Sequence, residues 1–318
     1  MIPETARPHQ SKRILFIGET SKFPTPHRPP AYYFYKYLKE LGHQVVKVVS
    51  TDFPTESLFD YQMIRQKFPA FDPELILVVE SYPLFNRFDF ASITQAAPIP
   101  TVLGSLDTPL RFEAHAQFGK YFNYVFTPHR EYLDYFKKQC GVKTFLLLFA
   151  CDPDVHKPYS KEEQYDLAFV GTASAVPDLY RERIAYLQSL KNTFHCAFYE
   201  TISDEQMVQI YAEAKMVFNY AVTNGFNRRI FDVLSCGKLL LTNRTPALDG
   251  IFDDKVHLIC YDNLPHLENL IHYYLDNPEK RAKIAAQGHY QVWKKHTMYH
   301  RIDVMLRRIF GESIYLSE

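Results

Sequence analysis

Short apolar runs alternate with segments of helical spacing along the first half of the chain. Six runs are predicted to be strands: residues 13–18, 44–50, 75–79, 101–103, 124–126 and 144–148. These runs are continuously apolar rather than alternating, which indicates strands buried on both faces of a sheet. Segments 32–41, 61–68 and 130–139 have the period of amphipathic helices. Strands that alternate with helices predict a doubly wound parallel α/β domain.

The same alternation resumes after a polar, proline-containing stretch at residues 151–164, which is typical of a linker between domains. Further strands are predicted at 166–171, 195–199, 216–220, 239–242 and 256–261, and helices at 179–190, 204–214, 228–235, 264–275, 278–288 and 290–310. We therefore predict two tandem Rossmann-like domains, over residues 1–155 and 156–300, followed by a C-terminal helix at 301–318. Their ligands are expected in an interdomain cleft, at the carboxyl ends of the strands.

Composition favours a folded protein of about two domains, with 318 residues of which 47% are hydrophobic. The 36 Lys and Arg residues balance the 36 Asp and Glu residues, so the chain lacks the basic excess typical of nucleic-acid partners. No run approaches the roughly 20 apolar residues of a membrane-spanning helix, so no integral membrane association is expected. Five scattered cysteines without a C-x-x-C pair favour reduced thiols in a cytoplasmic protein.

The most informative residues surround the predicted helix 228–235. Asn224 and Gly225 form a tight turn before it, and a helix N-terminus offers free N–H groups and a positive dipole end to an anion. Arg228 and Arg229 add permanent charges that can grip phosphate oxygens without a metal ion. Asp232, one turn further on, is suited to accept hydrogen bonds from ribose hydroxyls. Together these residues predict a diphosphate site.

Other candidates for binding follow neighbouring strands. Gly171 and Thr172 form a turn between a strand and a helix, and Arg183 extends from that helix toward the same edge. Thr242 and Arg244 end the strand after Gly237. Each has an ordinary structural alternative, because glycine turns, helix-surface ion pairs and strand-end turns are common.

Residues 219–252, NYAVTNGFNRRIFDVLSCGKLLLTNRTPALDGIF, resemble the C-terminal domain of group-1 glycosyltransferases with the GT-B fold. They are most similar to the spore-maturation, CgeB-like branch, whose pattern is N-G-x-N-x-R, an acidic helix residue, C-G, and a strand ending in T-x-R-x-x-x-L. The segment FACDPDVHKP at 149–158 is similar to the interdomain segment of that branch. Group-1 enzymes typically carry two carboxylates eight positions apart here, and this chain has Asn224 where the first would stand. The ribose role of Asp232 fits that pattern, whereas a carboxylate contact from position 224 to the donor sugar does not.

The resemblance implies transfer of a sugar from a nucleotide-diphosphate donor, preferably a UDP-sugar, to a hydroxyl acceptor on a glycan, a protein or a small molecule. It implies no metal and no other cofactor. The second domain would bind the donor, the first would bind the acceptor, and the last helix would pack back on the first domain. Two alternatives on this fold stay open: a non-catalytic nucleotide-sugar or carbohydrate-binding protein, which the amide at Asn224 favours, and a nucleotide-sugar epimerase.

A general base for the acceptor hydroxyl is expected from loops after strands of the first domain. Asp107, in the segment GSLDTP, is the leading candidate, His27 is the second and Glu80 is the third. Each has the alternative of being an ordinary loop residue. The tripeptide 152–154 has the D-x-D form that can chelate a metal ion, but it falls in the predicted linker and is interpreted as loop.

Overall fold

The computed structural model describes residues 10–20, 26–52, 58–79, 87–96, 98–173, 177–222 and 225–311. Contacts divide the chain into two compact units. Among the described residues, the first unit holds Arg28–Leu148 with residues 10–20 and 298–311. The second holds Phe149–Thr297 with residues 26 and 27. Each unit contains its own parallel sheet, so the prediction of two tandem Rossmann-like α/β folds is confirmed.

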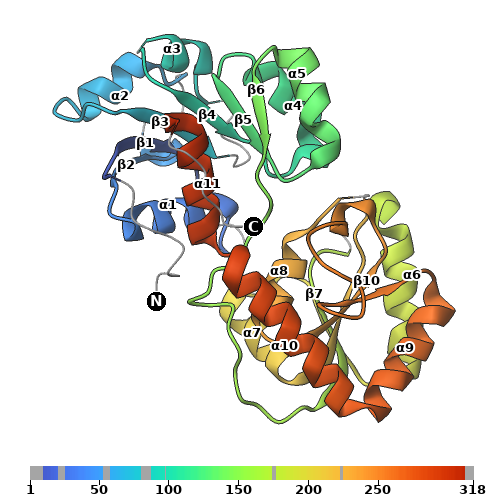
Figure 1. Ribbon diagram of the computed structural model, residues 1–318. Coiled ribbons are helices and arrows are strands. Elements are labelled where there is room, and N and C mark those ends of the chain that lie inside the picture. The colour runs from blue at the N-terminus through green and yellow to red at the C-terminus, as the bar shows by residue number, and fades with distance from the viewer. Residues whose placement is uncertain are drawn as a thin grey trace. The chain divides into compact units, whose positions relative to one another are not determined.

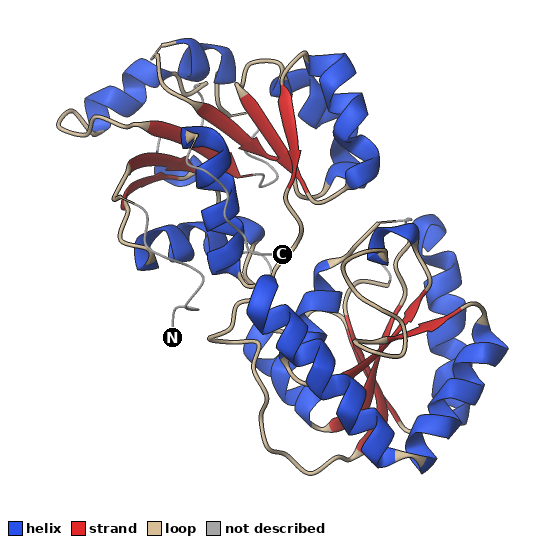
Figure 2. Cartoon of the chain, viewed as in Figure 1, coloured by secondary structure: helices blue, strands red, loops and turns tan. Residues whose placement is uncertain are grey.

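The first unit is a six-stranded parallel sheet with helices packed against it (Figures 1 and 2). Its strands are β1 (Arg13–Ile17), β2 (Gln44–Val48), β3 (Leu75–Val79), β4 (Thr101–Gly104), β5 (Tyr124–Thr127) and β6 (Lys143–Leu146). Its helices are α1 (Pro30–Glu40), α2 (Tyr61–Lys67), α3 (Phe90–Gln95), α4 (Thr108–Gly119), α5 (Leu133–Cys140) and α11 (Met298–Phe310). Successive side chains of a strand face opposite sides, and Ile14 to Ile17 are all at most 2% exposed. Both faces of this sheet are therefore covered, as the continuous apolar runs indicated.

The second unit is a five-stranded parallel sheet. Its strands are β7 (Tyr165–Val170), β8 (Cys196–Tyr199), β9 (Ala214–Asn219), β10 (Leu239–Asn243) and β11 (Ile259–Tyr261). Its helices are α6 (Pro177–Thr193), α7 (Asp204–Ala212), α8 (Arg228–Ser235), α9 (Leu264–Asp276) and α10 (Pro278–Lys295). Its core joins apolar residues of β7, β9 and β10 to side chains of α6, α9 and α10. The helix bounds expected at 228–235 agree with those of α8.

Each sheet reverses its strand order once. The first has the order β2-β1-β3-β4-β5-β6 and the second the order β11-β10-β9-β7-β8. The chain leaves β1 on one side and returns on the other with β3, and it does the same around β7 with β9. Loops at the carboxyl ends of two such strands diverge, which leaves a crevice where open α/β sheets bind ligands. In the second unit this place lies beside Gly171, after β7, and Asn219, at the end of β9.

Three predictions about the elements need correction. Helices α3 and α4 were not predicted, and β11 is shorter than the expected strand 256–261 because the chain turns at Lys255, which has a φ of 64°. The predicted helix end at Gly288 is wrong, since α10 continues to Lys295 and the break falls at residues 296–297. A Cβ at Gly288 would lie 2.3 Å from the carbonyl oxygen of His257, so this glycine permits close packing rather than ending a helix.

Helix α11 belongs to the first unit although the second unit separates it from the rest of that unit in sequence. Tyr299 packs its ring edge-on against Tyr37 of α1, with ring centroids 4.5 Å apart, and donates a hydrogen bond to Glu40 Oε2 at 2.6 Å. Arg301 Nε donates to the carbonyl oxygen of Leu148 at 2.8 Å. Figure 1 shows α11 beside α1.

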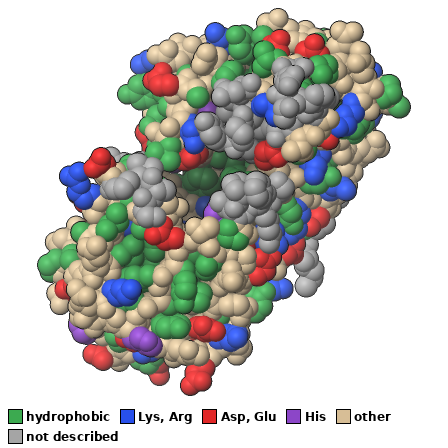
Figure 3. Space-filling view, turned by 180° about the vertical axis from the view of Figure 1, so that it is seen from behind, with side chains coloured by type: hydrophobic (Ala, Val, Ile, Leu, Met, Phe, Trp, Pro, Cys, Tyr) green, Lys and Arg blue, Asp and Glu red, His purple; other side chains and the backbone are tan. Residues whose placement is uncertain are grey.

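The surface carries both charge signs. Basic and acidic side chains are interspersed over the face seen in Figure 3, in keeping with a formal net charge of zero. Across the described ranges, none of the helices combines the length and the apolar character needed to cross a bilayer.

Candidate functional site

The strand ends at the reversal of the second sheet are tied together by Arg229. This side chain comes from the first turn of α8 and donates from Nε to the carbonyl oxygen of Val170 at 2.8 Å. Its Nη1 donates to Asn219 Oδ1 at 2.7 Å, and its guanidinium lies 4.3 Å from the ring centroid of Phe169. Burial lowers the pKa of Arg229, with opposing contributions from Tyr211 and Asp232. One arginine thus joins β7, β9 and α8.

Gly171 is fitted to this arginine. Its φ is 152°, a backbone conformation that side chains disfavour, and a Cβ there would lie 1.8 Å from Arg229 Nη2. The glycine therefore lets the guanidinium approach the backbone at the end of β7. Thr172, the next residue, is exposed.

Arg183 holds the same two strand ends from the side of α6. It donates from Nε and Nη2 to the carbonyl oxygen of Tyr220, at 3.2 and 2.9 Å, and from Nη1 to that of Thr172 at 2.6 Å. Burial, followed by the nearby charge of Arg229, lowers the pKa of Arg183 to about 10. The structure brings Gly171, Thr172, Arg183 and Arg229 together at these strand ends, and their role in binding a ligand stays a prediction.

Asn219 connects this group to the neighbouring strands. It is fully buried, and its Oδ1 accepts hydrogen bonds from Arg229 Nη1 and from Asn227 Nδ2, the latter at 2.8 Å. Its Nδ2 donates to Thr242 Oγ1 at 2.8 Å, and its carbonyl oxygen accepts from the Tyr261 hydroxyl at 2.7 Å. Thr242, 1% exposed, therefore faces Asn219 at the end of β10.

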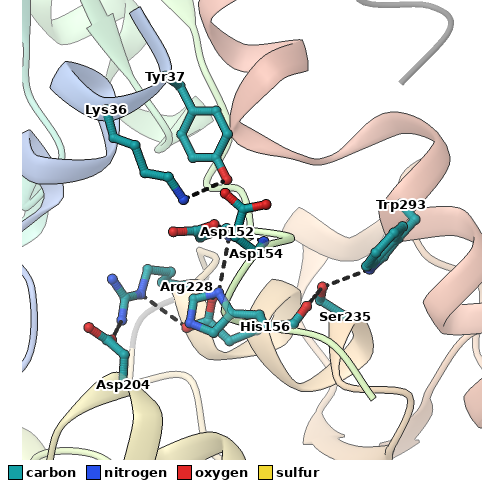
Figure 4. A network of polar contacts seen from close by, with 10 residues as sticks. Lys36, Tyr37, Asp152, Asp154, His156, Asp204, Arg228, Ser235 and Trp293 are labelled. Atoms are coloured by element: carbon teal, nitrogen blue, oxygen red, sulfur yellow. Dashed lines mark hydrogen bonds and ion pairs between the residues drawn. The ribbon is translucent and has the colours of Figure 1, made fainter. Parts of the chain in front are cut away.

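Arg228 lies among buried carboxylates (Figure 4). Its Nε donates to Asp232 Oδ2 at 3.0 Å and its Nη2 to Asp204 Oδ1 at 3.1 Å. Asp232 and Asp204 are 2% and 1% exposed, whereas the Arg228 side chain is 27% exposed. The predicted contact of Asp232 with ribose hydroxyls stays a prediction; in the structure its carboxylate binds Arg228.

His156, in the segment between β6 and β7, closes the other side of Asp232. Its Nδ1 lies 3.1 Å from Asp232 Oδ1 and 3.1 Å from the backbone nitrogen of Asp152. Burial lowers the pKa of His156, while the charge of Asp232 opposes that change. The carbonyl oxygen of His156 accepts a hydrogen bond from the Ser235 hydroxyl, which in turn accepts one from Trp293 Nε1 at 2.9 Å. The segment is thus bound to the middle and to the last residue of α8 (Figure 4).

Of the three candidates for the general base, the two in the described part of the chain occupy different surroundings. His27 is grouped with the second unit, and its pKa is lowered by burial and then by the charge of Arg228, with Asp204 opposing. Asp107 is exposed at the N-cap position of α4 in the first unit. Glu80 lies outside the described residues.

A buried polar network supports the loop that carries Asp107. Ser105, Thr108 and Thr127 are all 0% exposed. Their hydroxyls form a chain, with Thr108 Oγ1 at 2.9 Å from Ser105 Oγ and 2.7 Å from Thr127 Oγ1. Ser105 Oγ also lies 2.7 Å from His115 Nδ1. These bonds join β4, α4 and β5 behind the loop.

The remaining predicted residues are Gly225, Asn224 and Arg244. Gly225 is buried, and Asn224 lies outside the described residues. Arg244 binds Asp254 at 2.9 Å and Asp262 at 3.2 Å at the surface, and these hydrogen bonds raise its pKa. It lines a pocket of about 350 Å³ after β10, away from the hydrogen bonds that join Arg229 and Arg183 to the strand ends.

The D-x-D tripeptide is held within its own loop, because Asp152 Oδ1 accepts a hydrogen bond from the backbone nitrogen of Asp154. Within the described part of the chain, no cluster of three or more His, Cys, Asp or Glu side chains is arranged to hold a metal ion.

Sequence reasoning missed Asn219, Asn227, His156 and Asp204. A polar residue that ends an apolar strand was the signal for Asn219, and N-x-R was the signal for Asn227. Asp204 follows Ser203 in a capping box, a pattern that by itself explains an acidic first turn.

The family comparison matches the second half of the chain. Residues 156–307 match a family described as "Glycosyl transferase-like". No curated protein matches the chain.

Solved structures match over nearly the whole chain. Sucrose-phosphate synthase from Thermosynechococcus elongatus is 10% identical, with a TM-score of 0.66 over 94% of this chain and 99% of its own. An alpha-glucosyltransferase solved with UDP-glucose and DNA containing an abasic site is 9% identical, with a TM-score of 0.68 over 95% and 100%. Anabaena HepE, solved with UDP and glucose, is 13% identical, with a TM-score of 0.62 over 95% and 100%.

These similarities agree with the geometry at the reversal of the second sheet, where parallel strand ends, a helix start and arginine side chains meet. They show the two-unit fold of GT-B glycosyltransferases. Residues 156–307 are similar to a glycosyl transferase domain, and the solved structures share the fold over nearly the whole chain.

Proposed function

We propose that the protein transfers a sugar from a nucleotide-diphosphate donor, with a UDP-sugar preferred, to a hydroxyl acceptor. The observation that carries this proposal is the meeting of Arg228, Arg229 and the start of α8 beside the reversal of the second sheet. This combination offers cations and free backbone N–H groups to a diphosphate. Neighbours solved with UDP or UDP-glucose support the choice of donor.

The chemistry needs stabilisation of the charge that develops on the departing diphosphate. Arginine is permanently charged and donates in a planar fork, so the two residues at the start of α8 supply this stabilisation without a metal ion. Asp204 and Asp232 fix the direction of Arg228 and offset its charge. Arg229, whose side chain binds the neutral oxygens of Val170 and Asn219, therefore carries most of this stabilisation. Burial and then the charge of Arg228 lower the pKa of His27, which favours the neutral imidazole.

The first unit takes the acceptor in this proposal, with Asp107 as the leading general base. Its loop is held by the buried Ser105 and Thr108 hydroxyls. A rigid support is what a catalytic carboxylate on a loop requires. His27 is the alternative base. The CgeB-like branch remains our interpretation of residues 219–252.

The first test compares two arginines of the second unit. We expect Arg229→Ala to weaken UDP binding at least about tenfold, because a hydrogen bond to a charged group contributes roughly 1.5–3 kcal/mol. Arg181→Ala is the matched control: Arg181 pairs with the exposed Asp178, and its side chain is 78% exposed. Isothermal titration with UDP measures both, and equal small effects would remove the phosphate assignment.

The second test measures whether the protein catalyses sugar transfer. Incubation with nucleotide sugars, followed by measurement of free nucleoside diphosphate, should show release that increases when a suitable acceptor is added. Binding without release would favour the non-catalytic sugar-nucleotide protein, which the amide at Asn224 also favours. Conversion of one nucleotide sugar into another without an acceptor would identify an epimerase.

A further inference from the structure

Asn219 occupies an unusual place for a buried amide. It ends β9 at the reversal of the second sheet and is 0% exposed. Each polar atom of its side chain has a partner: Arg229 and Asn227 donate to Oδ1, and Thr242 accepts from Nδ2. Burying an amide is favourable only when such partners are present, so the contacts account for its burial.

The contacts also determine which way the amide faces. Arginine has donors only, so the atom of Asn219 that meets Arg229 must be the oxygen. The nitrogen then faces Thr242 Oγ1 at 2.8 Å, and a hydroxyl accepts there. The Tyr261 hydroxyl of β11 also donates to the main-chain oxygen of Asn219. Residue Asn219 of β9 is therefore held by β10, through Thr242, by β11 and by α8, through Arg229.

The neutrality of this acceptor matters for an anion site. An aspartate at the same place would form an ion pair with Arg229 and cancel much of its positive charge. The amide oxygen instead orients the guanidinium and leaves its net charge intact. It also holds Asn227, the residue immediately before α8, against β9.

We propose that Asn219 is a positioning residue of the donor site, which directs Arg229 and the start of α8 toward the diphosphate without neutralising the arginine. The inference rests on the proposed function, since it names a residue that prepares the same site. It applies to binding of the diphosphate rather than to the acceptor reaction. Loss of Asn219 should therefore raise the KM for the donor more than it lowers kcat.

The experiment compares three variants of the full chain by titration with UDP and by thermal unfolding. Asn219→Ala should weaken UDP binding at least tenfold. Asn219→Asp keeps both acceptor contacts and can receive a hydrogen bond from the Thr242 hydroxyl, so it should retain most of the thermal stability that alanine loses. It should nevertheless bind UDP at least tenfold more weakly than the wild type, because the carboxylate offsets the charge of Arg229.

Asn123→Ala is the control, at an exposed asparagine whose side chain also binds a neighbouring strand. Its Oδ1 accepts hydrogen bonds from the backbone nitrogen and the hydroxyl of Thr101 in the first unit, at 2.9 and 3.0 Å. It should lower stability and leave UDP affinity unchanged. Wild-type affinity in Asn219→Asp, or equal losses in Asn219→Ala and Asn123→Ala, would overturn the positioning role. Failure of the wild type to bind UDP or any other nucleoside diphosphate would instead overturn the proposed function.

Discussion

At the scale of single residues, the end of β7 is built around one close approach. Gly171 has no side chain, and Arg229 Nη2 occupies the space where a Cβ would stand. The guanidinium is also held by Val170 and Asn219. The position of Arg229 thus depends on the lack of a Cβ at Gly171 as well as on its hydrogen bonds.

Gly171→Ala should therefore lower stability and UDP affinity together. Gly250→Ala is the control, because Gly250 also has a positive φ, 75°, yet its Cβ would meet no atom within 4 Å. We expect Gly250→Ala to cost about 1 kcal/mol from backbone conformation alone. Gly171→Ala should cost about 2 kcal/mol more through overpacking. Urea unfolding measures both, and matching losses would show that Arg229 moves aside freely.

Arg228 is the second residue whose removal should be informative. Arg228→Met leaves Asp204 and Asp232 buried without their cation, which should cost about 3 kcal/mol. Adding Asp204→Asn and Asp232→Asn should restore most of that loss, since no uncompensated charge then remains. Arg181→Met removes only an exposed pair and should change the free energy of unfolding by less than about 0.5 kcal/mol. A triple variant no more stable than Arg228→Met would contradict this account.

The sequence predicted the two arginines of the candidate site but neither the amide of Asn219 nor Asp204. Arg228, Arg229 and the bounds of α8 follow from local pattern, because a turn, two basic residues and an apolar stripe are adjacent in the chain. The sequence marks Asn219 only as a polar residue at the end of an apolar strand; its role was missed because its partners on β10 and before α8 come near only after the sheet forms. His156 was missed for the same reason.

At the scale of elements, the segment between β6 and β7 is bound to helix α8 through buried polar contacts. His156 contacts Asp232 through its ring and Ser235 through its carbonyl oxygen. Trp293 extends the contact to α10. A substitution in this segment should therefore affect the stability of α8, the helix that carries Arg228.

This contact predicts a dependence of stability on pH. Burial lowers the pKa of His156 below its ordinary value of 6.5, so the folded protein keeps the ring neutral where the unfolded chain already binds a proton. Stability should therefore fall as pH drops below about 6.5, by at most about 1.4 kcal/mol per pH unit from this group. Asp152, Asp204 and Asp232 act against the shift and Arg228 acts with it.

His156→Gln tests the assignment, because its amide oxygen can accept from the backbone nitrogen of Asp152, its amide nitrogen can face Asp232, and the amide does not titrate. Urea unfolding between pH 7 and pH 5 should give a shallower decline for the variant than for the wild type. Parallel declines would place the pH dependence elsewhere, for example at His257 or His289, whose pKa values burial also lowers.

Helix boundaries were predictable where local signals decide them and not elsewhere. Gly141, with a φ of 67°, ends α5 as expected for a glycine after a helix. Gly288 carries the same sequence signal inside α10, where its role is to admit the carbonyl oxygen of His257. Only the packed structure separates these two uses of glycine.

At the scale of the whole molecule, the first unit is assembled from segments far apart in the sequence. Tyr299 is 5% exposed and packs against Tyr37, while Arg301 binds Leu148. Helix α11 is therefore part of the core of that unit rather than an appendage.

Tyr299→Ala should destabilise the first unit by about 3 kcal/mol, the usual loss for a buried aromatic side chain. Limited proteolysis with peptide mapping should find new cleavage within residues 28–148, with residues 149–297 still protected. Tyr290→Ala, at a side chain 64% exposed on α10, should leave the digestion pattern unchanged. Cleavage that spreads equally through both units would show that they unfold together.

The discontinuity of the first unit has a consequence for biosynthesis. A ribosome delivers all five strands of the second sheet before it delivers α11. Until α11 is synthesised, the first unit is incomplete and the apolar surface of α1 around Tyr37 is uncovered, while the second unit can already fold. Nascent chains halted just before Met298 should consequently recruit holding chaperones to the segment that was synthesised first.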